Sequence, residues 1–262
     1  MRICNLSSGS DGNLTYIETA GAKVLLDAGL SCLEITKRLN LLGVKPEQID
    51  AILITHEHQD HIKGLDVFAS KFGTKVYVHH KGYTAVVHKL KKEKDIQFIL
   101  FDDLDFNIND LQVSNFALPH DSVYCSGYTF KEKEKKVSIL TDLGHTSSEV
   151  LSKIMGSTLV YLESNHDEEM LKNNPSYPLM LKQRILGKNG HLSNLSAAQV
   201  IKELAQSGTK QVMLSHISTE NNTPSLAYNT ICSYLKEFGI EEGKHIKIAT
   251  TSIYPSFIFK ID

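Results

Sequence analysis

The sequence predicts an α/β protein in which two β-sheets are sandwiched between layers of helices. Short apolar segments with strand character alternate with longer segments in which apolar residues recur at helical spacing. Candidate site residues directly follow several of the apolar segments, which is where α/β architectures gather functional side chains. The composition, with 41% hydrophobic and 22% charged residues among 262, is that of a globular protein with ample core.

The first half of the chain reads as strands interrupted by helices. Turn-rich stretches, among them SSGSDGN and TAGA, separate the apolar segments. Gly43 is placed to end the first helix as its C-cap. We expect strands over 2–6, 14–19, 22–29, 51–55, 75–79 and 95–101, and helices over 31–43, 62–73 and 83–94.

The second half repeats this rhythm. The charged run KEKEKK is expected at a hairpin tip between two strands. Ser193 or Asn194 lies at the predicted start of one helix, and Pro224 starts the last helix. We expect strands over 111–118, 124–130, 136–142, 157–164, 210–216, 246–249 and 252–259, and helices over 194–208 and 224–239.

Charge and cysteine usage narrow the class of protein. Twenty-eight basic and 30 acidic residues give a net charge of −2, which excludes a general basic coat for nucleic acid and leaves a local basic groove open. The four cysteines form no CxxC pair, which favours free thiols in a reducing cytoplasm. No apolar run has the length of a signal peptide core or of a membrane span, so we expect no membrane partner.

The segment THEHQDH at 55–61 concentrates metal-binding side chains directly after an apolar strand. His56 and His58 are two residues apart, so on an extended segment their side chains point to the same side. Asp60 and His61 follow where the chain turns into a helix and can point back to a second position nearby. Imidazole and carboxylate suit zinc, and imidazole also suits iron or manganese. The alternative is an accidental histidine-rich surface loop, which its place after a buried strand disfavours.

Three single residues at other strand ends are candidates for the remaining ligands. His120 follows VSNFAL, Asp142 follows VSIL, and His216 follows VML. Because a carboxylate can bridge two ions, Asp142 can serve both. We therefore predict two sites for divalent ions (zinc, manganese or iron), one formed by His56, His58, His120 and Asp142 and the other by Asp60, His61, His216 and Asp142.

The pattern HxHxDH, followed by a distant histidine, a distant aspartate and a last histidine, resembles that of the metallo-β-lactamase-fold hydrolases. The resemblance runs through the whole chain. It implies one domain over residues 1–262, a four-layer αββα sandwich of two mixed sheets, and a dinuclear metal site at one edge. His58 stands where the flavo-diiron redox branch has a glutamate, which favours hydrolysis over redox chemistry.

Further segments narrow this resemblance to one branch of the superfamily. Six segments together resemble those of the WalJ/YycJ family: SSGSDGNLTYIE, LLDAGLS, THEHQDHIKG, ESNHDEEML, YPLMLKQRILGKNGHLSN and LSHISTENN. That family consists of bacterial cytoplasmic proteins regarded as DNA exonucleases acting from the 5′ end. The resemblance therefore implies DNA as the substrate, and hydrolysis of a phosphodiester by water activated at two metal ions.

Catalytic roles are expected for three residues. Asp60 would orient or deprotonate the attacking water in addition to binding metal. The resemblance makes His191, in GHLSN, the candidate donor of a proton to the leaving oxygen, with Glu163 as its orienting partner. The plainer alternative for His191 is a histidine at a helix start that only hydrogen-bonds the backbone.

Substrate contacts are expected at three further residues. KQRILGK places Arg184 just before GHLSN, where its guanidinium could hold a phosphate through two hydrogen bonds. Ser8 lies in a polar, glycine-rich loop that could line the pocket, although the loop could equally be a simple turn. Asn194, at the end of GHLSN, is the third candidate.

Two other functions fit the same ligands. A small-molecule hydrolase acting on a cyclic phosphodiester, thioester or lactone would be favoured by a narrow pocket closed by 164–190, whereas an open basic groove would favour DNA. A regulatory module with an inactive site is the third hypothesis, and the intact set of seven ligands counts against it.

Overall fold

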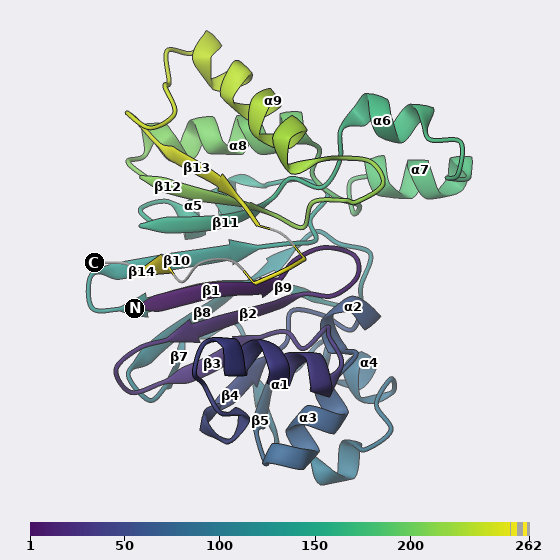
Figure 1. Cartoon of the computed structure of the whole chain (residues 1–262), viewed down its shortest axis with the longest axis vertical. Coiled ribbons are helices and arrows are strands. Elements are labelled where there is room, and N and C mark those ends of the chain that lie inside the picture. The colour runs from purple at the N-terminus through teal and green to yellow at the C-terminus, as the bar shows by residue number, and fades with distance from the viewer. Residues whose placement is uncertain (252, 256–258, 261–262) are drawn as a thin grey trace.

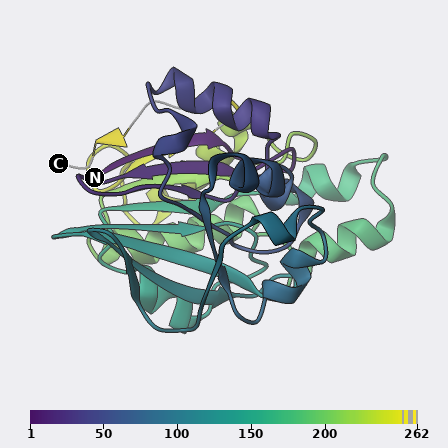
Figure 2. The same ribbon diagram turned by 90° about the horizontal axis from the view of Figure 1, so that it is seen from below.

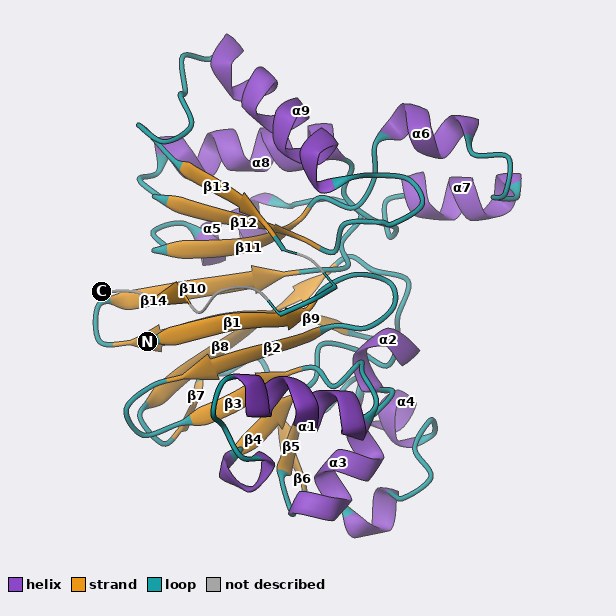
Figure 3. Ribbon diagram, viewed as in Figure 1, coloured by secondary structure: helices purple, strands orange, loops and turns teal. Residues whose placement is uncertain are grey.

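Four layers of secondary structure make up the computed structural model, which describes residues 1–251, 253–255 and 259–260 (Figure 1). Two seven-stranded sheets pack face to face, and helices cover their outer faces (Figure 3). The predicted αββα sandwich of two mixed sheets is thereby confirmed.

The first sheet has the strand order β14-β1-β2-β3-β4-β5-β6. Strands β1 to β3 are antiparallel neighbours, and β3 to β6 run parallel, so β3 and β4 end at the same edge. The strands are β1 Arg2–Ser7, β2 Leu14–Glu18, β3 Lys23–Leu26, β4 Ala51–Leu53, β5 Lys75–His79, β6 Phe98–Phe101 and β14 Phe259–Lys260.

The second sheet has the order β13-β12-β11-β10-β9-β8-β7. Strands β10 to β13 are parallel, and β9 runs antiparallel to both β8 and β10, so β8, β10, β11 and β12 end at one edge. The strands are β7 Phe106–Ile108, β8 Leu111–Leu118, β9 Cys125–Glu132, β10 Lys135–Leu140, β11 Leu159–Glu163, β12 Gln211–Ser215 and β13 Lys247–Thr250.

Helices form the outer layers and one projecting hairpin. The first sheet is covered by α1 Cys32–Leu41, α3 Leu65–Phe72 and α4 Tyr83–Val87, with α2 Gln59–Ile62 at its edge. The second is covered by α5 Ser148–Ile154, α8 Asn194–Gln206 and α9 Pro224–Glu237. Helices α6 Glu168–Asn173 and α7 Leu179–Leu186 extend from the body in both views (Figures 1 and 2). None of the helices in the described residues has the length and apolar character needed to cross a membrane.

Three apolar clusters fill the three interfaces between the layers. Alternation along the strands builds them, because successive side chains point to opposite faces of a sheet. In β3, Val24 and Leu26 pack between the sheets while Leu25 packs under the helices; in β4, Ile52 likewise faces the helices. Both faces of these strands are therefore buried, which explains their continuous apolar sequences.

Most predicted elements occur, and the differences have physical reasons. The helix expected over 83–94 ends at Val87, because the lysine-rich run that follows has almost no apolar face to bury. The helix expected over 62–73 is preceded by α2, which begins at Gln59. The elements β7, α5, α6 and α7 are not predicted; α7 contains no buried residue, so its apolar pattern is weak. Of the strand expected over 252–259, residues 252 and 256–258 lie outside the described residues.

Candidate metal centre and adjoining cavity

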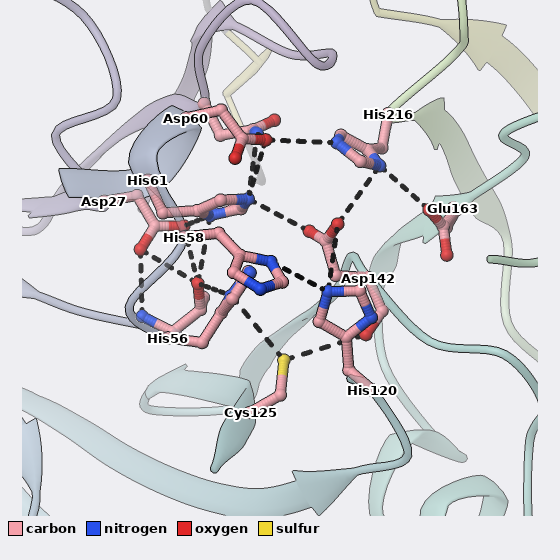
Figure 4. Close-up of polar contacts among 12 residues, drawn as sticks. Asp27, His56, His58, Asp60, His61, His120, Cys125, Asp142, Glu163 and His216 are labelled. Atoms are coloured by element: carbon pink, nitrogen blue, oxygen red, sulfur yellow. Dashed lines mark hydrogen bonds and ion pairs between the residues drawn. The ribbon is translucent and has the colours of Figure 1, made fainter. Parts of the chain in front are cut away.

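The edge at which β4, β8, β10 and β12 end gathers the candidate site (Figure 4). The structure brings together all seven residues that the sequence nominates as metal ligands. Four come from the segment that follows β4, and each of the other three follows a different strand of the second sheet: His56, His58, Asp60, His61, His120, Asp142 and His216.

One group consists of three imidazoles. The side chains of His56, His58 and His120 each offer a nitrogen within 4.8 Å of the others. The His58 Nδ1 lies 3.3 Å from the His120 Nε2. His120 donates from Nδ1 to the Gly190 carbonyl oxygen at 3.3 Å, which leaves Nε2 to face the cluster.

The second group combines Asp60, His61 and His216, again with ligand-type atoms within 4.8 Å of one another. The Asp60 Oδ2 lies 3.4 Å from the His61 Nε2 and 3.8 Å from the His216 Nε2. Asp142 lies between the two groups, with its oxygens 3.1 Å from the His61 Nε2 and 3.9 Å from the His120 Nε2. Asp142 can therefore serve both groups.

These residues fit a bound divalent cation. The Nε2 atoms of His56 and His216 are buried and have no hydrogen-bond partner among the described residues, a costly state for a polar atom unless a ligand satisfies it. Several imidazole nitrogens and carboxylate oxygens converge with them, and this donor set suits zinc and other transition metals. The clusters are compatible with divalent metal binding.

Burial favours the neutral form of two of the histidines. It lowers the pKa of His56 well below its usual value and also lowers that of His58. Burial by itself raises the pKa of the Asp142 carboxyl, but the adjacent His216 and His61 outweigh it and hold this pKa well below its usual value. Neutral imidazole and ionised carboxylate are the forms in which these side chains bind metal.

Two further ligand-type histidines, His61 and His216, sit among carboxylates. Burial lowers the pKa of His61, but the carboxylates of Asp27, Asp60 and Asp142 outweigh it and raise this pKa well above its usual value. The pKa of His216 is likewise raised by Asp142 against the effect of burial. The negative charge of these carboxylates favours a cation at both imidazoles. A metal ion can take the place of the proton there.

The backbone adopts the energetically unfavourable left-handed conformation at three strand ends beside the site. Asp27, Asp142 and His216 have left-handed φ angles of 62°, 63° and 53° and follow β3, β10 and β12. Such a conformation costs about 1–3 kcal/mol for a residue other than glycine, and it persists where the surrounding structure enforces it. The sharp turns place these side chains at the shared edge.

Asp27 is a site residue that the sequence did not reveal as such. Its Oδ2 accepts a hydrogen bond from the His61 Nδ1 at 2.7 Å, and its Oδ1 accepts one from the Thr55 backbone N–H at 2.9 Å. The bond fixes His61 with Nε2 toward Asp142. Asp27 directly follows the apolar run VLL, although the predicted strand continues to residue 29, so the signal that found Asp142 and His216 could also have found it.

Substituting Asp27 by asparagine is expected to weaken metal binding roughly 10–100-fold, because His61 loses the carboxylate that orients it. Titration of the metal-free protein against a chromogenic chelator measures the affinity. Asp50→Asn is the control, because its exposed carboxylate accepts a backbone hydrogen bond from Lys23 and belongs to neither ligand group. Unchanged metal affinity in Asp27→Asn would contradict the positioning role.

Glu163 lies behind the site and joins two histidines. Its Oε1 accepts hydrogen bonds from the His191 Nδ1 at 2.7 Å and from the His216 Nδ1 at 2.8 Å, and its Oε2 accepts backbone bonds from Leu143 and Leu192. Although burial opposes it, the two imidazoles lower the pKa of Glu163 to about 2. The Glu163 side chain is fully buried, and its hydrogen bonds hold the rings of both histidines in place.

Two of the residues nominated for substrate contact make hydrogen bonds within the protein. The Ser8 hydroxyl accepts the His216 backbone N–H at 2.8 Å, which positions the segment after β12. The Asn194 amide is 1% exposed, and its oxygen accepts hydrogen bonds from the Ser164 hydroxyl and the Asn222 amide. A substrate contact at Asn194 is incompatible with this burial.

Arg184 lies beside the site on α7. Its Nε donates to the Asp121 Oδ2, and the other oxygen of Asp121 is 3.4 Å from the His120 Nε2. The sequence did not single out Asp121, which has no apolar strand or motif of its own to mark it. Asn13 is a further neighbour, and its amide donates to the Asp60 Oδ2 at 3.2 Å.

Comparison with known proteins agrees with this architecture. The family model described as the beta-lactamase superfamily domain matches residues 22–217. The exodeoxyribonuclease WalJ of Streptococcus pneumoniae is 38% identical over 94% of this chain and 93% of its own length, and the exodeoxyribonuclease YycJ of Bacillus anthracis is 35% identical over the same shares. The crystal structure of the metallo-β-lactamase-fold protein YhfI from Bacillus subtilis has a TM-score of 0.74 at 14% identity, covering 99% of this chain and 100% of that chain.

The fold and the site together define a metal-dependent hydrolase of the metallo-β-lactamase fold. The matched domain covers most of the chain, and the two relatives are similar over nearly all of it. The chain therefore belongs to the beta-lactamase superfamily and, within it, to the WalJ/YycJ family.

Proposed function

We propose that this chain is a cytoplasmic DNA exonuclease that uses two divalent ions to release nucleotides from the 5′ end, and that residues 1–262 work as one domain. The observation that carries the proposal is the convergence of seven ligand-type side chains at one edge of the sandwich, in a chain similar over most of its length to exodeoxyribonucleases. Those relatives do not favour a small-molecule hydrolase, and the intact cluster disfavours an inactive module.

The cluster divides into two sets of ligands that Asp142 joins. One ion would be held by the three imidazoles of the first group, the other by Asp60, His61 and His216, and Asp142 would contact both. Ions held by these residues would supply positive charge next to a phosphate group and would lower the pKa of a bound water toward neutrality.

Asp60 reaches the surface of the cluster. Its side chain is 25% exposed, unlike the buried Asp142, and the Asn13 amide and His61 fix its Oδ2. From this position Asp60 can accept a hydrogen bond from the attacking water and orient it toward phosphorus. Its second role is to bind metal beside His216.

His191 faces the cluster from the other side. Because its Nδ1 donates to Glu163, its Nε2 is left for the substrate, and the side chain is partly exposed. Its ring centroid lies 5.3 Å from those of both His120 and His216. When the bond between phosphorus and the leaving oxygen breaks, the His191 Nε2 can give its proton to that oxygen.

His191→Ala is expected to slow DNA hydrolysis roughly 10²–10⁴-fold while both ions remain bound. Hydrolysis of bis-p-nitrophenyl phosphate should fall much less, because its leaving group departs without a proton. The kcat on each substrate and the metal content of the purified variant measure the two effects. An equal loss on both substrates would contradict the role of His191 as proton donor.

The proposed function is tested with 5′-labelled and 3′-labelled duplex DNA, with Mn²⁺ and separately with Zn²⁺. Release of labelled mononucleotide from 5′-labelled DNA at the earliest times supports the proposal. Asp60→Ala should lack this activity, which excludes a contaminating nuclease. First release from the 3′ label overturns the polarity, and activity on bis-p-nitrophenyl phosphate without any on DNA overturns the nuclease.

A further inference from the structure

A cavity of about 180 Å³ adjoins the candidate metal centre. Its lining includes His191, which faces the metal cluster, and Arg184 with its partner Asp121. Another part of the wall comes from the segment that forms the projecting α6–α7 hairpin (Figures 1 and 2). The cavity therefore lies between this hairpin and the edge at which phosphate would be hydrolysed.

The walls of the cavity differ in chemistry. Tyr177, Leu181 and Ile185 supply an aromatic ring and two aliphatic side chains from the hairpin. Asn165 and Asn221 supply amides from the loops after β11 and β12. A flat, apolar group with polar atoms on its rim matches both, and a nucleobase has this character.

Tyr177 is placed to stack with such a group. Its side chain is half-buried, and no described aromatic residue stacks on its ring. A ring that lines a cavity without an aromatic neighbour offers a face to a ligand. Stacking of a base on an aromatic side chain is tolerant of sequence, as a nuclease that meets every base at a DNA end requires.

Arg184 supplies charge beside this ring. Its Nε bonds to Asp121, which in turn approaches the His120 imidazole, so the guanidinium is held next to the metal cluster. The side chain is 56% exposed, and within the described residues its two terminal nitrogens have no hydrogen-bond partner. Two parallel N–H groups in this position suit a phosphate oxygen pair.

We propose that this cavity is a subsite for one nucleotide next to the scissile phosphate, with its base against Tyr177, Leu181 and Ile185 and its phosphate at Arg184. The role of this subsite in DNA cleavage rests on the proposed function. Binding of a nucleotide to the cavity does not. A cavity of about 180 Å³ has room for a single base. A terminal nucleotide would have to leave its partner strand to place its base there, which is easier at a duplex end than within a duplex.

Binding is tested by calorimetry on the metal-loaded protein with deoxyadenosine 5′-monophosphate, and with inorganic phosphate as the comparison. The wild type is expected to bind the nucleotide at least tenfold more tightly than phosphate. Tyr177→Ala should remove most of this difference, while Tyr177→Phe, which retains the ring, should preserve it. Leu179→Ala is the matched control, because this neighbouring side chain is 68% exposed and does not line the cavity.

The first comparison of a kinetic test uses the wild type alone and so depends on no variant. DNA with an abasic residue at one end or the other is compared with intact DNA as a substrate of the wild type. An abasic residue at the attacked end should lower kcat/KM about tenfold, and Tyr177→Ala should show less than a twofold dependence on that base.

The outcomes separate this subsite from the proposed function. If DNA is cleaved with no dependence on the terminal base, and nucleotide and phosphate bind alike, the subsite is wrong and the nuclease stands. If DNA is not cleaved but nucleotide binding depends on the Tyr177 ring, the subsite stands and the nuclease falls. Unchanged nucleotide affinity in both Tyr177→Ala and Arg184→Ala overturns the inference outright.

Discussion

Asp142→Asn is expected to reduce hydrolysis of both DNA and bis-p-nitrophenyl phosphate by on the order of a thousandfold or more. The Asp142 carboxylate lies 3.1 Å from the His61 Nε2 and 3.9 Å from the His120 Nε2, so it contributes to both ligand groups. The amide keeps the shape of the side chain but loses the charge and one acceptor. At least one ion should therefore bind weakly or not at all.

The measurement combines kcat/KM on the two substrates with the metal content per chain after dialysis. Asp105→Asn serves as the control, because this exposed carboxylate accepts a hydrogen bond from the Gln112 amide and belongs to neither ligand group. Full metal content together with activity within tenfold of wild type in Asp142→Asn would rule out a shared ligand at this position.

Gly29→Ala should be among the most destabilising small substitutions in the chain. A Cβ at Gly29 would lie 1.7 Å from the Asp60 carbonyl oxygen and 2.5 Å from the Asn13 backbone nitrogen. These atoms belong to a hydrogen-bonded crossing, in which the Gly29 N–H donates to the Asn13 carbonyl and the Asn13 N–H donates to the Asp60 carbonyl at 2.7 Å. Neither neighbour can move without displacing the metal-binding loop, so we expect a loss of roughly 3–5 kcal/mol in the free energy of unfolding.

Urea unfolding followed by circular dichroism gives this free energy and the m-value. Gly73→Ala is the matched control, because Gly73 has a left-handed φ of 66° and open space around the added methyl group. It should cost only about 1–2 kcal/mol, from backbone strain alone. Equal costs at the two positions would show that the backbone crossing at Gly29 relaxes more easily than its geometry indicates.

Strand periodicity predicted the layers and much of the site for a single physical reason. In parallel strands that share a direction, the residue after each strand arrives at one common edge, so His120, Asp142 and His216 could be grouped without knowledge of the fold. Segments whose apolar residues follow neither the strand period nor the helix period were not predicted. The α6–α7 hairpin buries little apolar surface, and its place beside the metal edge depends on tertiary packing that leaves no local pattern.

The supporting residues were the harder part of the site. Asp27 followed an apolar run as the ligands do and lay in the segment LLDAGLS, but no histidine beside it marked it as part of a site. Asn194 was nominated from its neighbours in sequence, yet its side chain turns into the protein to bond Ser164 and Asn222. The orientation of a polar side chain at a helix start depends on hydrogen-bond partners that are distant in sequence. These partners cannot be identified from a single sequence.

The ligand-type residues are drawn from both sheets, four from the segment after β4 and three from the ends of β8, β10 and β12. Occupancy of the centre would consequently clamp the two halves of the sandwich together as well as equip the enzyme for catalysis. In a cell that lacks the metal, the protein would be inactive and also more easily degraded by proteases. Its abundance and its total activity would then decline together.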